Sequence, residues 1–316
     1  MKLKDIYELA IETGIGADPR GRAVIEAQLA KRREGFEKLS EEDKTLFDSE
    51  KLRNPYGDTR VLTGALEAEI GGLIAGIDME SSEILLADRL REKGEKIDMI
   101  LAHHPEGAAL AALHEVMGMQ ADVWHNFGVP INVGDAMIGT RAKEVQRALS
   151  PVNHNRPVDA ARLLGLPMMC VHTPADNLVS EFLQKQFDDD PPLFLDDVVK
   201  RLKAVPEYEA AVRIGAGPRI IAGSGGNRAG KVLVMMTGGT GGPEESIERL
   251  AAAGVGTMVE MHLDEKLRKK AEEHHLNVVI AGHIASDNIG MNLLLDKLEA
   301  KGISIKTCSG LVRVKR

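Results

Sequence analysis

Three apolar, strand-like runs in this chain of 316 residues each stop at a histidine, and twice an aspartate follows four residues later. The segments are residues 97–102 before His103 and His104, residues 168–171 before His172 with Asp176, and residues 278–282 before His283 with Asp287. The carboxyl ends of strands in an open α/β sheet are where such folds place their chemistry. Imidazole and carboxylate are ligand types for zinc, manganese and iron. Four histidines and two aspartates therefore predict a site for two divalent metal ions.

Each motif also has an interpretation without a metal. Adjacent side chains on an extended segment point to opposite sides, so His103 and His104 can both bind only if the backbone turns there. Thr173 is a good helix N-cap, and Asp176 falls where a first-turn acid stabilises the helix dipole. Ser286 can cap the helix that follows the third motif. For each motif alone, both interpretations stay open, and the repetition at three strand ends favours a shared metal site.

A further strand end carries Glu260 and His262, which follow the apolar run 256–259. Side chains two residues apart on a strand lie on the same side. The two residues are interpreted as hydrogen-bond partners of metal ligands, as an acid/base pair, or as a surface pair. As an acid/base pair, they are the candidate catalytic residues of this chain.

Two glycine-rich segments resemble phosphate-binding loops. Residues 225–231 have the spacing of a P-loop, but Val232 follows where Ser or Thr is required, and a strand follows in place of a helix. We reject that interpretation. Residues 237–243 follow a strand and open a helix, so their backbone amides can hold a phosphate or a carboxylate. Because Glu244 and Glu245 already occupy the start of that helix, a tight turn is the preferred interpretation.

Composition and charge exclude several classes of protein. The formal net charge is −8, and a nucleic-acid backbone is not expected as a partner because phosphate binding needs clustered Lys and Arg. The two cysteines, Cys170 and Cys308, lie far apart, which indicates a reducing compartment and no disulfide framework. No window has the length of a membrane span, and the first residues do not form a secretory signal. We therefore expect a cytoplasmic protein with no membrane partner.

Strand-like and helical segments alternate from about residue 61 onwards, which predicts an α/β fold. The expected strands are 70–77, 98–102, 168–171, 219–222, 231–236, 257–261, 277–281 and 303–306. Residues 1–60 show apolar residues at helical spacing and predict a helical N-terminal extension that packs on the body or on a neighbour. The expected domains are the extension 1–60, a first α/β half 61–200 and a second α/β half 212–316.

These residues together resemble the Nif-three-like family, the GTP cyclohydrolase type 2-like dinuclear metal proteins. The family motifs His-His-Pro, His-Thr-x-x-Asp and Gly-His-x-x-x-Glu appear here in that order at 103–105, 172–176 and 282–287, with Asp287 in place of the usual Glu. The resemblance covers residues 61–316. It implies two related α/β halves with a metal pair in the cleft between them, and often homo-oligomers. By position, it implies the metal ligands His103, His104, His172, Asp176, His283 and Asp287.

The leading hypothesis is a metal-dependent hydrolase with two divalent ions (zinc, manganese or iron) and a small-molecule substrate. A nucleotide- or pterin-like substrate is implied by the family name only. Asp176 is expected to bridge the ions, and Glu260 or His262 to move protons. The alternative is a non-catalytic metal-binding or regulatory protein that docks a partner on residues 1–60. A phosphate-binding module built on the glycine-rich segments is the third hypothesis.

Overall fold

The computed structural model describes all residues, Met1–Arg316, and contains two β-sheets. The first sheet has the order β1 (Arg60–Thr63), β4 (Met168–Cys170), β3 (Met99–Ala102), β2 (Gly72–Gly76) and β9 (Ser304–Thr307). The second has the order β5 (Arg219–Ala222), β8 (Asn277–Ile280), β7 (Val255–Glu260) and β6 (Lys231–Met235). In both sheets one edge strand, β1 or β5, is antiparallel and the other strands are parallel. The α/β fold with two related halves is confirmed.

Helices separate and cover the sheets. They are α1 (Leu3–Gly16), α2 (Arg22–Glu37), α3 (Glu41–Leu46), α4 (Ser81–Glu92), α5 (Gly107–Ala111), α6 (Met119–Asn126), α7 (Ile131–Leu149), α8 (Arg156–Leu163), α9 (Thr173–Asp189), α10 (Leu195–Lys203), α11 (Pro206–Arg213), α12 (Glu245–Ala252), α13 (Glu265–Glu273) and α14 (His283–Glu299). Two short 3₁₀ helices lie at Ser49–Leu52 and Leu113–Gly118. None of the helices is long and apolar enough to cross a membrane.

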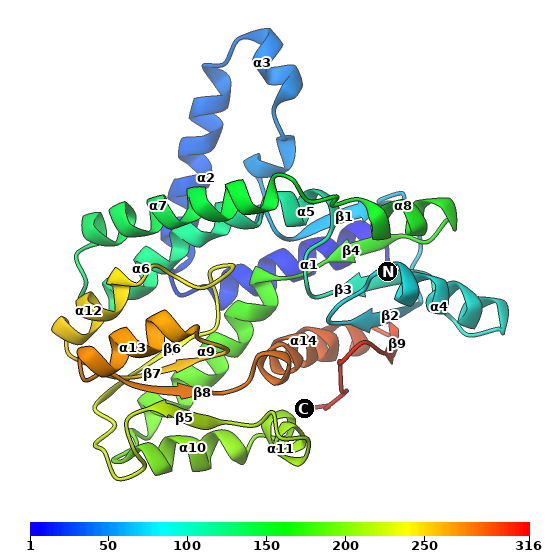
Figure 1. Cartoon of the computed structure of the whole chain (residues 1–316). Helices are drawn as coiled ribbons and strands as arrows, with labels where there is room; N and C mark the ends of the chain where they lie inside the picture. Colours follow the sequence, from blue (N-terminus) through cyan, green and yellow to red (C-terminus); the bar gives the residue numbers. More distant parts are fainter.

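The two helices that carry the aspartates, α9 and α14, lie between the sheets (Figure 1). Alternation along each strand sends neighbouring side chains to opposite faces. Met169 of β4 joins α1, α9 and α14 in one core, whereas Met168 joins α4 and α8 in another. In the second sheet, Val279 of β8 faces α9, α10 and α14, whereas Val278 faces α6, α7, α12 and α13. This layering places the starts of α9 and α14 beside the carboxyl ends of both sheets.

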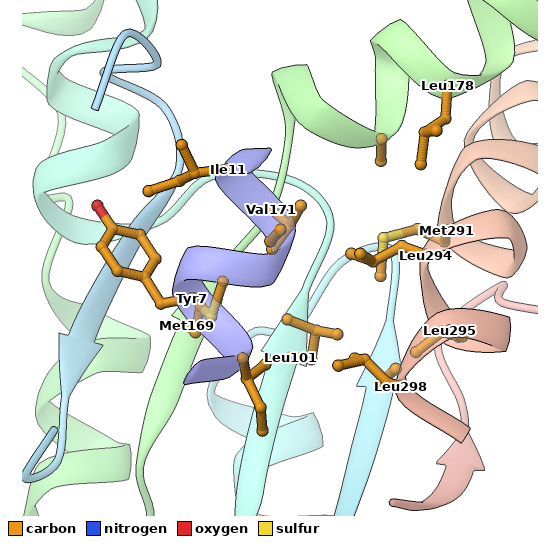
Figure 2. Packing of buried hydrophobic residues seen from close by; sticks show 14 of the residues in the cluster. Tyr7, Ile11, Leu101, Met169, Val171, Leu178, Met291, Leu294, Leu295 and Leu298 are labelled. Atoms are coloured by element: carbon orange, nitrogen blue, oxygen red, sulfur yellow. The ribbon is translucent and has the colours of Figure 1, made fainter. Parts of the chain in front are cut away.

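The N-terminal segment is partly inside this core. Figure 2 shows Tyr7 and Ile11 of α1 packed in the cluster that holds Met169 and Leu101 from the first sheet and Leu294 from α14. In contrast, α2 and α3 project from the body (Figure 1). Helix α3 begins after Ser40, which is its N-cap because the backbone amide of Asp43 donates to the Ser40 hydroxyl over 3.1 Å.

Several elements differ from the expectations. Helix α9 begins at Thr173 itself, with His172 and not Thr173 as N-cap. Helix α14 begins at His283, before the predicted cap Ser286, because the chain turns into the helix at Gly282, which has φ of +113°. Strand β1 was not expected, and it pairs with β4. Strand β9, from the end of the chain, pairs with β2 in the first sheet and not with a strand of the second half. The boundaries of the three domains stay a prediction.

Candidate metal centre

The structure brings the six predicted ligands to one place between the sheets. His103 and His104 directly follow β3, His172 follows β4, and His283 begins α14 directly after the segment that follows β8. Three overlapping groups have ligand atoms within 4.8 Å of one another, and together they include all six residues. The groups are His103, His104 and His172; His104, His283 and Asp287; and His103, Asp176 and Asp287.

The spacing of four residues is explained by the helices. Asp176 is in the first turn of α9, four residues after His172 at the N-cap, and Asp287 lies four residues after His283 at the start of α14. Residues four apart on a helix lie on the same face. Neither helix has a side-chain cap hydrogen bond, and Oδ1 of Asp176 and both carboxylate oxygens of Asp287 have no hydrogen-bond partner. Asp176 does lie in the first turn of α9, where its charge also stabilises the helix dipole as predicted. Ser286 does not cap α14, because its hydroxyl donates to the carbonyl of Gly282.

A close contact between α9 and α14 holds the two aspartates together. A Cβ atom at Gly290 of α14 would lie only 2.2 Å from the carbonyl oxygen of Ala175 in α9. Only glycine permits the two backbones to approach so closely. As a result, Oδ1 of Asp176 and Oδ1 of Asp287 each lie 3.5 Å from Nε2 of His103, although they belong to opposite halves of the sequence.

Hydrogen bonds orient the rings of the His-His-Pro motif. Nδ1 of His103 lies 3.0 Å from the carbonyl oxygen of Val171 and donates to it, so Nε2 is the nitrogen that faces the two aspartates. Nδ1 of His104 lies 2.6 Å from the carboxylate of Asp78, and its Nε2 lies 3.5 Å from Asp287. The two rings are 5.2 Å apart between centroids, so both adjacent histidines reach the same site.

A buried carboxylate from the N-terminal segment orients His172. Oδ2 of Asp58 lies 2.9 Å from Nδ1 of His172 and accepts a second hydrogen bond from the hydroxyl of Thr173 over 2.6 Å. The Asp58 side chain is fully buried. A carboxylate on one ring nitrogen of a histidine fixes the tautomer that leaves the other nitrogen free for a metal.

The unpaired atoms of the cluster fit a divalent cation. Five buried atoms have no hydrogen-bond partner: Nε2 of His103, Nε2 of His104, Oδ1 of Asp176 and both carboxylate oxygens of Asp287. Buried polar groups without partners are rare because each costs free energy. These imidazole nitrogens and carboxylate oxygens converge on one place without hydrogen bonds between them. Zinc, manganese and iron bind such sets of nitrogen and oxygen ligands. The cluster can therefore hold a metal ion.

Burial and the mutual charges of the cluster shift its pKa values in opposite directions. Burial lowers the pKa of His172, but the charge of Asp176 and the hydrogen bond to Asp58 outweigh burial and raise this pKa to about 9. Burial lowers the pKa of His283 to about 4. For Asp287, burial acts to raise the pKa, but the charge of His103 and its neighbours holds it well below its usual range. The cluster thus contains both protonated and neutral imidazoles in the metal-free chain.

The predicted catalytic pair lies beside this cluster. Glu260 and His262 line the same cavity of about 360 Å³ as His104, Asp176 and Asp287. The ring of His262 packs edge-on against that of His283, with 4.9 Å between centroids. The Glu260 carboxyl has no charged partner, and burial raises its pKa to about 8. Their catalytic role stays a prediction.

Two aspartates that contact the histidines were missed from the sequence. Asp78 lies two residues after β2, so the rule that strand ends carry the functional groups could have found it. Asp58 precedes the antiparallel strand β1 and lies near the end of the predicted N-terminal extension 1–60. No signal in the sequence distinguishes Asp58 from an ordinary turn residue.

Comparisons with known proteins agree with the architecture. No family model matches the chain, and no curated protein matches it. Among solved structures, a NIF3 superfamily protein from Sphaerobacter thermophilus is similar at a TM-score of 0.71 and 24% identity, over 83% of this chain and 94% of that one. Reduced HcgD from Methanocaldococcus jannaschii is similar at a TM-score of 0.48 and 16% identity, over 84% of this chain and 94% of that one. By its likeness to the Sphaerobacter protein, this chain has the fold of a NIF3 superfamily protein.

Proposed function

We propose that this protein is a metal-dependent hydrolase that binds two divalent ions between its two sheets. The observation that carries the proposal is the convergence of five buried, unpaired nitrogen and oxygen atoms from both halves of the chain. Hydrogen bonds alone would have satisfied these atoms if their role were structural. The cavity beside them is lined by His104, Asp176 and Asp287, so a small substrate in it would lie against three of the four residues that carry these atoms.

The proposal assigns a task to each group of residues. His103, His104, His172, His283 and the two aspartates would hold the ions, and Asp58 and Asp78 orient two of the rings. Bound divalent ions supply Lewis acidity and make water a better nucleophile near neutral pH. Asp176, whose Oδ1 lies 3.5 Å from Nε2 of His103, would serve as the bridging carboxylate. Glu260 lines the cavity with a carboxyl that still carries its proton at neutral pH, so it can donate a proton to a leaving group.

The substrate of this proposal is a small molecule. A cavity of about 360 Å³ is at the lower end of the range for small-molecule sites. A nucleotide- or pterin-like compound is the substrate that the family resemblance suggests, and a homo-oligomer is the assembly that it suggests.

The first experiment is elemental analysis of protein purified without chelators or a histidine tag. We expect about two equivalents of metal per chain, and a clear loss in His172→Ala and Asp287→Ala. His274→Ala is the matched control because His274 lies outside the cluster, and it should keep its metal. A parent protein without metal, or metal content that both site variants retain, would contradict the proposal.

A second measurement separates the hydrolase from the non-catalytic alternative. Metal-loaded protein is screened for hydrolysis of small phosphate esters, amidines and cyclic amides. Turnover that disappears in Asp176→Ala and after complete metal removal supports the hydrolase. Bound metal that only raises the unfolding temperature, with no turnover of any substrate, supports a binding or regulatory protein.

A further inference from the structure

The glycine-rich loop 237–242 forms the wall of the cavity that includes the predicted ligands. Thr237, Gly239, Thr240, Gly241 and Gly242 line this cavity together with His104, His172, His283 and both aspartates. Because a glycine has no side chain, the surface that the three glycines contribute is backbone. The tight turn predicted from the sequence is thus also part of the site.

The backbone of this loop is held from outside by side chains of the helical layer. Nε2 of Gln120 donates to the carbonyls of Gly238 and Thr240 over 2.7 and 2.6 Å, and Nε of Arg141 donates to the carbonyl of Gly241 over 3.2 Å. Three carbonyls of the loop are therefore occupied. These hydrogen bonds fix the loop in one conformation, in which Gly238 and Gly239 have φ of +100° and +83°.

The amides of the loop have no such partners. The N–H groups of Gly239, Gly241 and Gly242 donate to no acceptor in the chain, and only the amide of Thr240 bonds within the loop, to the carbonyl of Gly238. Successive backbone amides that include residues of positive φ form concave sites that bind anions. The residues that carry these donors line the same cavity as the residues that can hold the ions.

The other residues that line the cavity indicate which functional group the ligand carries. No lysine or arginine lines the cavity, so the charge of an anion must be balanced by the metal ions and by backbone dipoles. Oε1 of Gln120 is buried without a partner, and Gln120 is only 2% exposed. Because Gln120 lines the cavity, this oxygen can accept a hydrogen bond from a donor on the ligand. A hydrogenphosphate group offers both acceptor oxygens and an O–H, whereas a carboxylate offers acceptors only.

We propose that the loop 237–242 is a phosphate-binding wall, which holds the phosphate of the substrate between its free amides and the metal ions. The inference rests on the proposed function, because the ions supply the opposing charge. It names the substrate class, a small phosphate-bearing molecule. The start of α12 does not supply the site, because Pro243, Glu244 and Glu245 separate its first free amides from the cavity-lining glycines.

One position of the loop permits a matched pair of variants. A Cβ atom at Gly241 would meet nothing within 4 Å, and Gly241 does not have a positive φ. Gly241→Pro removes one amide donor, and Gly241→Ala keeps the donor while adding a similar Cβ atom. The probe is inorganic phosphate, titrated calorimetrically into the metal-loaded protein at constant ionic strength. We expect Gly241→Pro to weaken phosphate binding about tenfold and Gly241→Ala to weaken it less than twofold.

Metal content is measured for each variant before phosphate is added, so that a failure of the metal site is seen separately. A metal-loaded parent that binds no phosphate would overturn the inference, as would equal affinities of the parent and Gly241→Pro. Equal losses in both variants would overturn it too, because the added bulk and not the donor would then be responsible. Acetate that binds as tightly as phosphate would contradict the assignment of phosphate.

A second measurement avoids any effect of proline on folding. Protein labelled with ¹⁵N-glycine is titrated with phosphate, and the loop signal of Gly241 is identified by its loss in Gly241→Ala. We expect the amide signals of the loop glycines to move with phosphate in the metal-loaded protein. The exposed glycines at positions 35 and 94 serve as controls and should not move. Unmoved loop signals at saturating phosphate would overturn the inference.

Discussion

His172, after β4, and His283, after β8, occupy related places in the two halves, each with an aspartate four residues further along a helix. Their surroundings differ. The His172 side chain is 9% exposed and bonds to a buried carboxylate, whereas the His283 side chain is 39% exposed and its ring makes no hydrogen bond. Accordingly, the pKa of His172 is raised to about 9 and that of His283 is lowered to about 4. The same strand–helix pattern thus gives a buried histidine with a fixed ring orientation in the first half. In the second half it gives a more exposed histidine whose ring no hydrogen bond orients.

The difference has a physical origin in the N-terminal segment. Asp58 reaches His172 from the turn before β1, and the second half has no equivalent carboxylate behind His283. The second half instead has Glu260, which lacks a charged partner and whose pKa burial raises to about 8. We infer that the first half is pre-organised for metal, whereas the second half remains accessible to substrate.

The largest effect should come from Asp287, which connects the two halves. Its carboxylate oxygens lie 3.5–3.6 Å from ring nitrogens of His103, His104 and His283. Asp287→Asn removes the charge at nearly constant volume, and we expect metal affinity to fall at least 100-fold. Isothermal titration of the chelator-treated protein with zinc measures this change. Unchanged affinity would show that the first half binds metal by itself.

The next largest effect concerns the contact between the helices of the two halves. In Gly290→Ala, the new methyl group would collide with the carbonyl of Ala175. We expect a loss of about 2–3 kcal/mol in the free energy of unfolding. Urea denaturation measures the loss, with Gly139→Ala in α7 as control, because a methyl group there meets nothing within 4 Å. Equal stabilities of the two variants would contradict the close contact.

A smaller effect on metal affinity is expected from the two carboxylates that orient histidine rings, Asp58 and Asp78. Asp58→Asn removes the buried charged acceptor of His172, and we expect metal affinity to fall about tenfold. Asp78→Asn changes the corresponding partner of His104, but Asp78 is 56% exposed, so water can replace it and a loss of about threefold is expected. The same zinc titrations measure both variants. Equal losses would remove the distinction between a buried and an exposed orienting group.

The smallest effect tests Glu260 through pH. Its folded pKa of about 8 lies above the ordinary value of 4.5, so between these values the folded state holds a proton that the unfolded state has lost. This carboxyl therefore lowers stability progressively as pH rises from 4.5 to 8. Glu260→Gln should remove that loss and be more stable than the parent above pH 8 by about 1 kcal/mol, since partial exposure reduces the effect. A stability difference that does not change with pH would contradict the burial of a neutral Glu260.

Much of the fold follows from local periodicity. The strand runs before His103, His172 and His283 were predicted because apolar runs between turn residues are typical of buried strands. The caps predicted at Thr173 and Ser286 put the starts of α9 and α14 too late, because the observed N-cap residues are His172 and Gly282. Strand β9 was predicted as a strand, but its partner β2 was not, since pairing between distant segments leaves no local pattern.

By itself, the sequence determined which residues can bind a metal and that they stand at strand ends, because residue type and alternation are local properties. Only the tertiary structure decided that His103 and His104 reach one site, that both aspartates lie beside the histidines, and that Asp58, Asp78 and the loop 237–242 join them. The reason is that these groups meet through the packing of α9 against α14 between two sheets. That packing depends on contacts between residues more than 100 positions apart, such as Ala175 and Gly290.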